Sequence, residues 1–155
     1  MIKLFFLSVF PLFMFFDTDK ETPNLELVRG YYDKAVADKT LCDNMIKDLQ
    51  QVSGETIFLA YLGGFQTIWA KHASNPISKL KTFNRGKKNI ESAIKMQPDN
   101  IEIRFIRLSV QKNAPSFLGY NKNIKEDQLF IENNRREIRS PVLLKNIDKL
   151  LKHSK

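Results

Sequence analysis

The sequence is poor in the residues on which disulfides, metal sites and redox centres depend. Its 155 residues include one Cys, Cys42, and two His, of which His153 lies in the tail of the sequence. A single cysteine cannot form a disulfide within the chain, and a structural zinc site usually takes four Cys or His ligands. The composition therefore predicts no zinc site of this type, and we expect neither a metal nor a cofactor.

Glycine, proline and alternating patterns are also scarce. Gly and Pro number six each, too few for a collagen-like or low-complexity chain. The alternation of apolar and polar residues that marks a strand is not sustained anywhere in the sequence. With 43% hydrophobic residues and a length that fits one domain, the chain is predicted to be all-α and globular.

The sequence has one long hydrophobic run, near its start. Residues 4–16 form an uncharged run of 13 residues after Lys3. A helix needs about 20 apolar residues to span a membrane, so this run is too short. A short basic start followed by an apolar core of this length is typical of a secretory signal peptide. No small-residue cleavage signal follows Phe16, so an uncleaved anchor and a buried first helix remain as alternatives.

These observations divide the chain into three parts. We predict a signal peptide or an N-terminal membrane anchor in residues 1–16, a linker in residues 17–24 and a single helical domain in residues 25–155. We expect the protein to be exported, either to the periplasm or out of the cell. Anchoring to the membrane through the N-terminus is the alternative.

Apolar residues recur at helical spacing through the predicted domain. In the fourth predicted helix, Ile77, Leu80 and Phe83 are expected to point inward. The fold class that follows is all-α, with about six or seven helices stacked as antiparallel hairpins. The helices are predicted over residues 25–37, 39–52, 57–74, 76–96, 101–113, 125–138 and 140–153.

The third predicted helix is expected to form the centre of the core. It carries no charge between Glu55 and Lys71, and it has apolar residues on one face and small residues on the other. Gly63 and Gly64 each cost roughly 1 kcal/mol relative to Ala inside a helix, so another interaction must compensate for them. We predict that a neighbouring helix approaches closely at these glycines.

Residues 86–100 resemble the second helix of a tetratricopeptide repeat. In that family a small residue, a large apolar residue, Ala and Pro recur at fixed offsets, and Gly86, Ile90, Ala93 and Pro98 have this spacing. The resemblance implies stacked helical hairpins and, by analogy, a peptide-binding role. The chain as a whole is similar to small exported bacterial proteins of unassigned function.

His72 is the first candidate functional residue, because it lies near the end of the predicted core helix. A histidine there can bond carbonyl groups left open at a helix end, which is the structural interpretation. The alternative interpretation is a ligand-binding or acid–base role. No catalytic motif accompanies His72, so the sequence leans against an enzyme.

A second candidate site combines positive charge with aromatic rings. The sequence predicts a groove between hairpins in which arginines bind a carboxylate while aromatic rings pack against the ligand. The residues predicted to form this site are Lys71, His72, Arg104, Arg107, Phe117 and Tyr120.

The charge of +8 is unevenly distributed along the chain. Residues 17–78 hold six Lys and Arg against nine Asp and Glu, whereas residues 79–155 hold 18 against eight. A charged stripe is most often a solvated face, and an anionic partner is the alternative. The predicted basic surface consists of Lys81, Arg85, Lys88 and Lys95.

The sequence as a whole predicts an exported, non-enzymatic helical module that binds a peptide or another anionic partner. One alternative is a small-molecule-binding protein or an unrecognised hydrolase centred on His72. Another is a protein that attaches to a membrane surface through its C-terminal amphipathic helix. A polysaccharide is a further possible partner, and specific nucleic-acid binding is not expected because no recognition motif is present.

Overall fold

The computed structural model describes residues 22–52 and 54–152. This part of the chain contains seven α-helices and no strand, which confirms the predicted all-α fold with six or seven helices. The predicted signal or anchor segment, most of the predicted linker and His153 lie outside the described residues. The helices are α1 (Leu25–Lys34), α2 (Lys39–Leu49), α3 (Thr56–His72), α4 (Pro76–Met96), α5 (Ile101–Asn113), α6 (Ile124–Asn133) and α7 (Pro141–Lys152), with 3-10 turns η1 (Ser116–Leu118) and η2 (Arg135–Glu137).

Polar side chains cap the starts of several helices. The side-chain oxygen of Asn75 accepts a hydrogen bond of 2.8 Å from the backbone N–H of Ser78, and Pro76 occupies the first position of α4. Asn100 caps α5 in the same way. Such caps satisfy N–H groups that have no partner within the helix. The start of α4 at Pro76 and the full extent of α5 are therefore as predicted.

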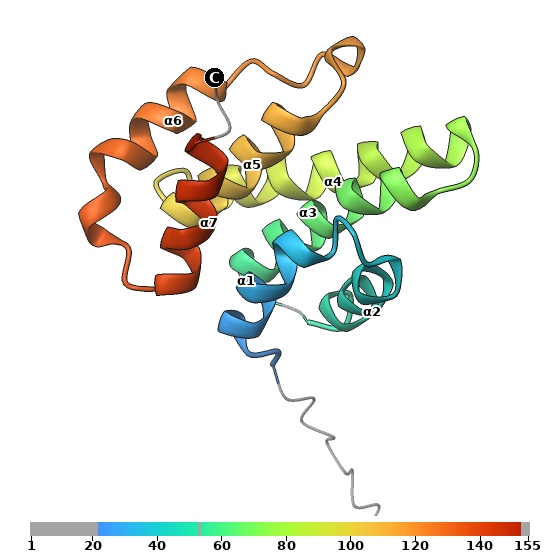
Figure 1. Cartoon of the computed structure of the whole chain (residues 1–155), viewed down its shortest axis with the longest axis horizontal. Helices are drawn as coiled ribbons and strands as arrows, with labels where there is room; N and C mark the ends of the chain where they lie inside the picture. The colour runs from blue at the N-terminus through green and yellow to red at the C-terminus, as the bar shows by residue number, and fades with distance from the viewer. Residues whose placement is uncertain (1–21, 53, 153–155) are drawn as a thin grey trace, which may run out of the picture.

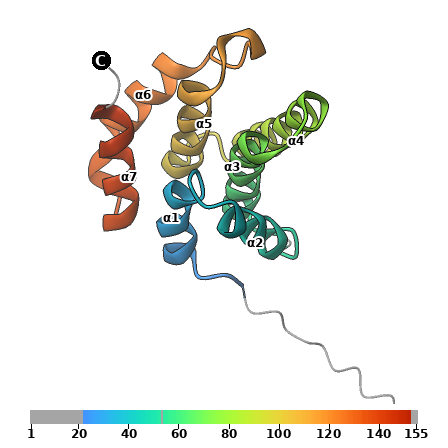
Figure 2. The same cartoon turned by 45° about the vertical axis from the view of Figure 1, so that its right-hand side comes forward.

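The helices α3 and α5 are the inner members of the assembly (Figure 1). In Figure 2, α6 and α7 lie on one side of this pair, and α2 and α4 lie on the other. The burial of α3 follows from its uncharged sequence, because both of its faces are covered, as predicted.

Two glycines of α3 allow close packing on its two sides. A Cβ atom on Gly63 would lie 2.6 Å from the carbonyl oxygen of Gly86, and one on Gly86 would meet the carbonyl oxygen of Gly63. The backbones of α3 and α4 therefore touch, which confirms the predicted close approach. On the other side, a Cβ atom on Gly64 would lie 2.6 Å from Cε2 of Tyr32, so this glycine makes room for an aromatic ring of α1.

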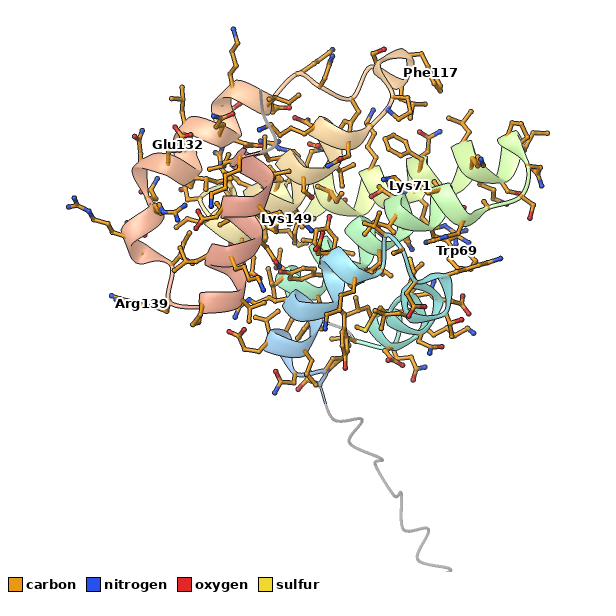
Figure 3. All side chains as sticks on the ribbon, in the orientation of Figure 1. Trp69, Lys71, Phe117, Glu132, Arg139 and Lys149 are labelled. Atoms are coloured by element: carbon orange, nitrogen blue, oxygen red, sulfur yellow. The ribbon has the colours of Figure 1, made fainter. Side chains whose placement is uncertain are left out.

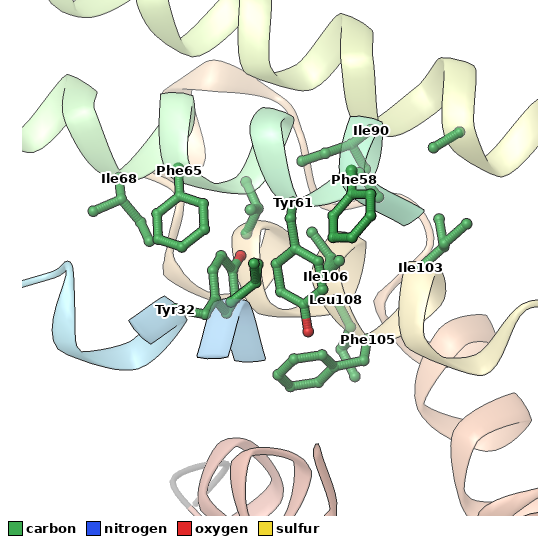
Figure 4. Close-up of a cluster of buried hydrophobic side chains, with 14 of the residues drawn as sticks. Tyr32, Phe58, Tyr61, Phe65, Ile68, Ile90, Ile103, Phe105, Ile106 and Leu108 are labelled. Atoms are coloured by element: carbon green, nitrogen blue, oxygen red, sulfur yellow. The ribbon is translucent and has the colours of Figure 1, made fainter. Parts of the chain in front are cut away.

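Aromatic rings fill the space between α1, α3 and α5 (Figure 4). The ring of Tyr32 stands edge-on to the rings of Tyr61, Phe65 and Phe105, with centroid separations of 5.4, 5.5 and 6.2 Å. Edge-to-face pairs at these separations add stabilisation beyond the burial of their area. This cluster holds the three helices in fixed positions, and the candidate site is built on its surface.

Several details of the predicted helices are wrong. The helices predicted over residues 25–37 and 39–52 end at Lys34 and Leu49. The helix predicted over residues 125–138 ends at Asn133, where the side chain of Asn134 bonds the carbonyl of Phe130, and the turn η2 follows. Ile77 and Leu80 do not point inward; their exposed fractions are 81% and 49%. Within residues 22–52 and 54–152 no helix covers this side of α4 at its start, so residues of an apolar stripe are exposed there.

The amphipathic helix α7 packs against the rest of the domain. Leu143 and Ile147 are buried, and Leu150 is partly buried against the core. The apolar stripe that suggested attachment to a membrane is therefore used for contacts with α1 and α5. None of the helices in the described ranges is both long enough and apolar enough to cross a membrane.

Candidate functional site

An open groove with a volume of about 710 Å³ runs between α1, α3, α4, α5, η1 and α7. Its floor consists of buried side chains from α3, α4 and α5, and exposed side chains of α4, η1 and α7 line its sides. The buried apolar residues of this floor include Ile68, Phe83, Phe105 and Val110.

Large apolar side chains gather around the mouth of the groove. Phe117, Leu80 and Val36 line it and have exposed fractions of 84%, 49% and 41%. Exposed apolar side chains that stand alone are ordinary, whereas several around one concave surface indicate a binding site. The groove is therefore the strongest candidate for a binding site in the described part of the chain.

The polar atoms at the base of the groove are already bonded within the protein. The hydroxyl of Ser109 donates to the carbonyl of Ile106 at 2.8 Å, and it lies 2.8 Å from the phenol of Tyr32. Because the single Ser109 proton is used in the first bond, Tyr32 is the donor in the second. The hydroxyl of Thr67 likewise donates to the carbonyl of Gly64 at 2.7 Å. The base of the groove therefore favours an apolar ligand surface.

Lysines stand at the edge of the groove (Figure 3). Lys149 is paired with Asp33 at 2.6 Å, which joins α7 to α1. Lys71 and Lys79 are exposed, and no carboxylate of the described residues lies within ion-pair distance of either. The edge of the groove thus offers two positive charges that no group of the described chain neutralises.

Tyr120 fixes the segment that carries η1 onto α4. Its hydroxyl donates to Oε1 of Glu91 at 2.6 Å, and its ring stands edge-on to Phe83 with centroids 6.1 Å apart. Nζ of Lys87 lies 5.0 Å from the centre of the same ring. Burial raises the pKa of Tyr120, and the nearby Glu91 carboxylate raises it further. Tyr120 is thus a neutral group that holds one wall of the groove.

Arg104 and Arg107 do not reach the groove, because they face α6 and bind Asp127. Arg107 donates to both carboxylate oxygens of Asp127 at 2.7 Å, and Arg104 donates to one of them at 3.0 Å. The exposed fraction of Asp127 is 0%. Arg104 also donates to the carbonyl of Pro98 at 2.6 Å, and its guanidinium lies 4.2 Å from the centre of the Phe130 ring. The carboxylate that these arginines bind is therefore one of the protein's own.

This buried cluster of charges also reaches the wall of the groove. Burial opposes the charge of Arg107, but its hydrogen bonds to Asp127 and the charges of Asp127 and Glu91 outweigh this effect and raise the pKa of Arg107. Nη1 of Arg107 lies 3.6 Å from Oε2 of Glu91, the residue that accepts from Tyr120. Asp127, Arg107, Glu91 and Tyr120 thus connect α6, α5 and α4 to the segment that carries η1.

A second buried cluster joins α1, α3 and α5. Arg29 donates through Nε and Nη2 to the two carboxylate oxygens of Glu102, and Tyr61 donates to Oε1 of Glu102 at 2.6 Å. The hydrogen bond with Glu102 raises the pKa of Arg29, and burial raises that of Tyr61. The pairing with Arg29 and the bond from Tyr61 offset the cost of burying the charged Glu102 carboxylate away from water.

His72 takes part in a contact between helix ends. Its Nε2 lies 3.1 Å from the carbonyl oxygen of Ala35, the residue that ends α1. A carbonyl oxygen accepts only, so Nε2 is the donor. The ring also lies 5.9 Å from the ring of Trp69. His72 therefore satisfies a carbonyl at the end of α1, a different helix from the one to which it belongs.

The structure brings only two of the six predicted binding residues to the groove, Lys71 and Phe117. His72, Arg104, Arg107 and Tyr120 instead make contacts that hold the surrounding helices. The predicted basic surface on α4 is exposed along its length.

Sequence reasoning missed Leu80, Lys79 and Val36, which the structure places at the groove. Leu80 belongs to an apolar stripe, and such a stripe by itself predicts burial. A useful signal was the apolar character of Ile77 and Leu80 together in the first turns of a helix, next to Lys79. This signal marks an apolar surface, but it cannot say whether another helix covers it.

Comparisons of the chain with protein-family models, with curated proteins and with solved structures found no match. Within the residues that the structure describes, no group of three or more His, Cys, Asp or Glu side chains could hold a metal ion.

Proposed function

We propose that this protein is a non-enzymatic binding module whose groove takes the apolar face of an amphipathic helix from a partner protein. The observation that carries this proposal is the open apolar groove with two unpaired lysines, Lys71 and Lys79, at its edge. Acidic side chains that flank the apolar face of the partner helix complement these lysines. A helix that lays its apolar stripe in a groove is a common mode of peptide recognition.

The apolar contacts of the groove by themselves predict a weak affinity for the partner helix. Covering an exposed Leu or Phe side chain contributes roughly 1.5–3 kcal/mol, and the groove offers Phe117, Leu80 and Val36 as such contacts. Association costs at least about 4 kcal/mol in lost freedom of motion. The remaining free energy, at most about 5 kcal/mol, corresponds to a dissociation constant of about 0.2 mM or weaker from these apolar contacts alone.

A designed peptide pair tests this proposal. The probe is a labelled amphipathic helix with a leucine stripe flanked by glutamates, and its match has lysines in place of the glutamates. Fluorescence anisotropy should show binding of the acidic peptide, weakened at least about tenfold by Leu80→Asp because the new carboxylate enters an apolar contact. Leu129→Asp is the matched control, since Leu129 is an exposed leucine of α6 that does not line the groove.

The charges at the edge are tested separately. The double substitution of Lys71→Glu and Lys79→Glu should reverse the preference of the groove from the acidic peptide to the basic one. If the two peptides bind wild-type protein equally, or if Leu80→Asp and Leu129→Asp act alike, the groove is not the binding site for such a helix.

The volume of the groove favours a second candidate ligand, a small amphiphile with an apolar tail and a carboxylate. Pockets for small organic ligands commonly have volumes of about 300–1,000 Å³, and the groove has about 710 Å³. A fluorescent long-chain fatty acid tests it directly. Binding of the fatty acid that Leu80→Asp abolishes, without binding of the acidic peptide, would replace the first proposal by this one.

In this proposal the ligand contacts the lysines and apolar residues of the groove, and not Arg104 and Arg107 as the sequence predicted. It also moves the small-ligand alternative away from His72, which bonds a backbone carbonyl. Export through residues 1–16 and the likeness to tetratricopeptide repeats stay predictions. The likeness agrees with peptide binding, and export would place the partner outside the cytoplasm.

A further inference from the structure

The outer face of α4 carries a row of cations that form no ion pair with any carboxylate in the described part of the chain. This helix has six Lys and Arg residues and one acidic residue, Glu91, whose carboxylate is engaged by Tyr120 and Arg107. Lys79 stands at the groove and Lys87 lies over the ring of Tyr120. The four other cations of α4 form the basic stripe, which consists of Lys81, Arg85, Lys88 and Lys95.

The basic stripe is straight and accessible. At about 100° per residue its members fall within a sector of roughly 80° on α4, and from Lys81 to Lys95 they extend about 21 Å. All four are exposed, and α4 lies at the edge of the domain with α3 on its inner side (Figure 2). None of them has a described carboxylate within ion-pair distance.

Several cations on other helices form ion pairs with carboxylates of the protein. Arg29, Arg104 and Arg107 are paired in the interior, and on the surface Lys47 and Lys149 pair with Asp43 and Asp33. Four neighbouring cations on one face without such a partner leave a concentrated positive potential, which attracts an anionic surface.

Exposed apolar side chains stand at both ends of the basic stripe. Ile77, one turn before Lys81, is 81% exposed, and Met96, next to Lys95, is 55% exposed. We propose that α4 docks this face on an anionic phospholipid bilayer, with the four cations at the phosphate groups and Ile77 and Met96 in the acyl boundary. At a membrane interface, exposed apolar side chains beside a basic face can enter the acyl boundary while the cations meet the phosphate groups, whereas non-specific binding to nucleic acid rests chiefly on the charges.

This surface is independent of the proposed function. The groove and the basic stripe share α4 but no residue, so one can be lost while the other remains. Docking through α4 would hold the domain at a membrane without a spanning segment and leave the groove to its own ligand.

Vesicle binding by the full chain tests the proposal. We measure partition to phosphatidylcholine vesicles with and without one-third phosphatidylglycerol, and we take the ratio of the two partition coefficients. This ratio isolates the contribution of charge, because apolar contacts with lipid contribute to binding of both kinds of vesicle. Wild-type protein should favour the anionic vesicles at least about tenfold at low salt, and high salt should remove this preference.

Two sets of variants locate the contact. Replacing Lys81, Arg85, Lys88 and Lys95 by Gln should reduce the ratio at least about tenfold. The control replaces four exposed cations outside α4, Lys122, Lys125, Arg136 and Lys145, by Gln and has the same net charge. It should keep the ratio within about twofold of wild type, and circular dichroism should show that both variants are folded.

The apolar ends are tested by Ile77→Ser, which should weaken binding to anionic vesicles at least about threefold, whereas Leu129→Ser should have no effect. The proposal is overturned if wild-type protein shows no preference for anionic vesicles, or if both quadruple variants lose it equally. It is also overturned if the α4 variant binds vesicles normally but loses affinity for a DNA duplex, since nucleic acid would then be the partner.

Discussion

The helices α4 and α5 carry cations at similar helical spacing, but the two sets have opposite surroundings. Arg104 and Arg107 of α5 are buried against Asp127, whereas Arg85 and Lys88 of α4 are exposed without a carboxylate partner. The difference comes from the neighbouring helices. Because α6 covers the polar stripe of α5, the charges of that stripe must be neutralised there. Because no helix of the described residues covers the outer face of α4, its charges remain available to a partner.

The consequence is that the two sets have different kinds of role. A buried cation with a complete set of hydrogen bonds positions helices, and removing its partner leaves an uncompensated charge. An exposed cation contributes little to stability because water and salt screen it. Substitutions in α5 and its contacts should therefore change folding, while substitutions in α4 should change binding.

The largest expected effect is that of Asp127→Ala. It removes the carboxylate that Arg107 binds through two bonds, and it leaves two buried guanidinium groups without this partner. We expect a loss of roughly 3–5 kcal/mol in the free energy of unfolding, measured by urea denaturation. Glu132→Ala is a control at an exposed acidic residue of the same helix. A loss below about 1 kcal/mol for Asp127→Ala would show that this cluster does not hold α5 and α6 together.

An intermediate effect is expected at alkaline pH, and it again concerns the contacts of α5. Burial raises the pKa of Tyr32, which donates to Ser109 of α5, to about 12. The raised pKa means that the neutral phenol stabilises the folded protein. This stabilisation is complete below the pKa of an unfolded tyrosine, about 10, and is lost as the pH rises towards 12.

The loss attributable to Tyr32 is roughly 3 kcal/mol, which urea denaturation between pH 8 and 12 measures. Phenolate absorbance should increase together with loss of helical circular dichroism, and Tyr32→Phe should make stability less dependent on pH in this range. Full ionisation of the tyrosines near pH 10 in a protein that keeps its helicity would contradict the role assigned to their burial.

The smallest effect is expected on α4. Arg85→Gln and Lys88→Gln should each change the free energy of unfolding by less than about 0.5 kcal/mol, because neither side chain has a partner to lose. Urea denaturation at low and high salt measures this. A loss as large as that of Asp127→Ala at either position would remove the distinction between α4 and α5.

Much of the fold was predictable from local sequence patterns. Asn75 and Pro76 marked the start of α4, and the uncharged stretch with Gly63 marked α3 as a helix covered on both sides. The end of α6 was not predictable in this way. The apolar pattern continues beyond Asn133, but a bond from Asn134 to a backbone carbonyl closes the helix.

The candidate site was less predictable than the fold. Lys71 and Phe117 were identified, because an exposed charge and an aromatic loop are visible in the sequence. Arg104 and Arg107 were predicted as ligand contacts, and the structure places both against Asp127. Leu80 was predicted to be buried, but it lies at the mouth of the groove. The helical periodicity groups these residues by face of the helix. Whether such a face is buried or exposed depends on which other element packs against it, and the periodicity does not contain that information.

The amino-acid sequence by itself determined the helices, their caps and the scarcity of potential metal ligands, because these depend on residues close in the chain or on composition. Tertiary structure decided which cations are neutralised and which apolar surface remains open. Arg107 and Asp127 are 20 residues apart, and their bond exists only because α5 packs on α6. The groove likewise needs side chains from α1, α3, α4, α5, η1 and α7 together, and no local pattern specifies the space between elements so far apart in the chain.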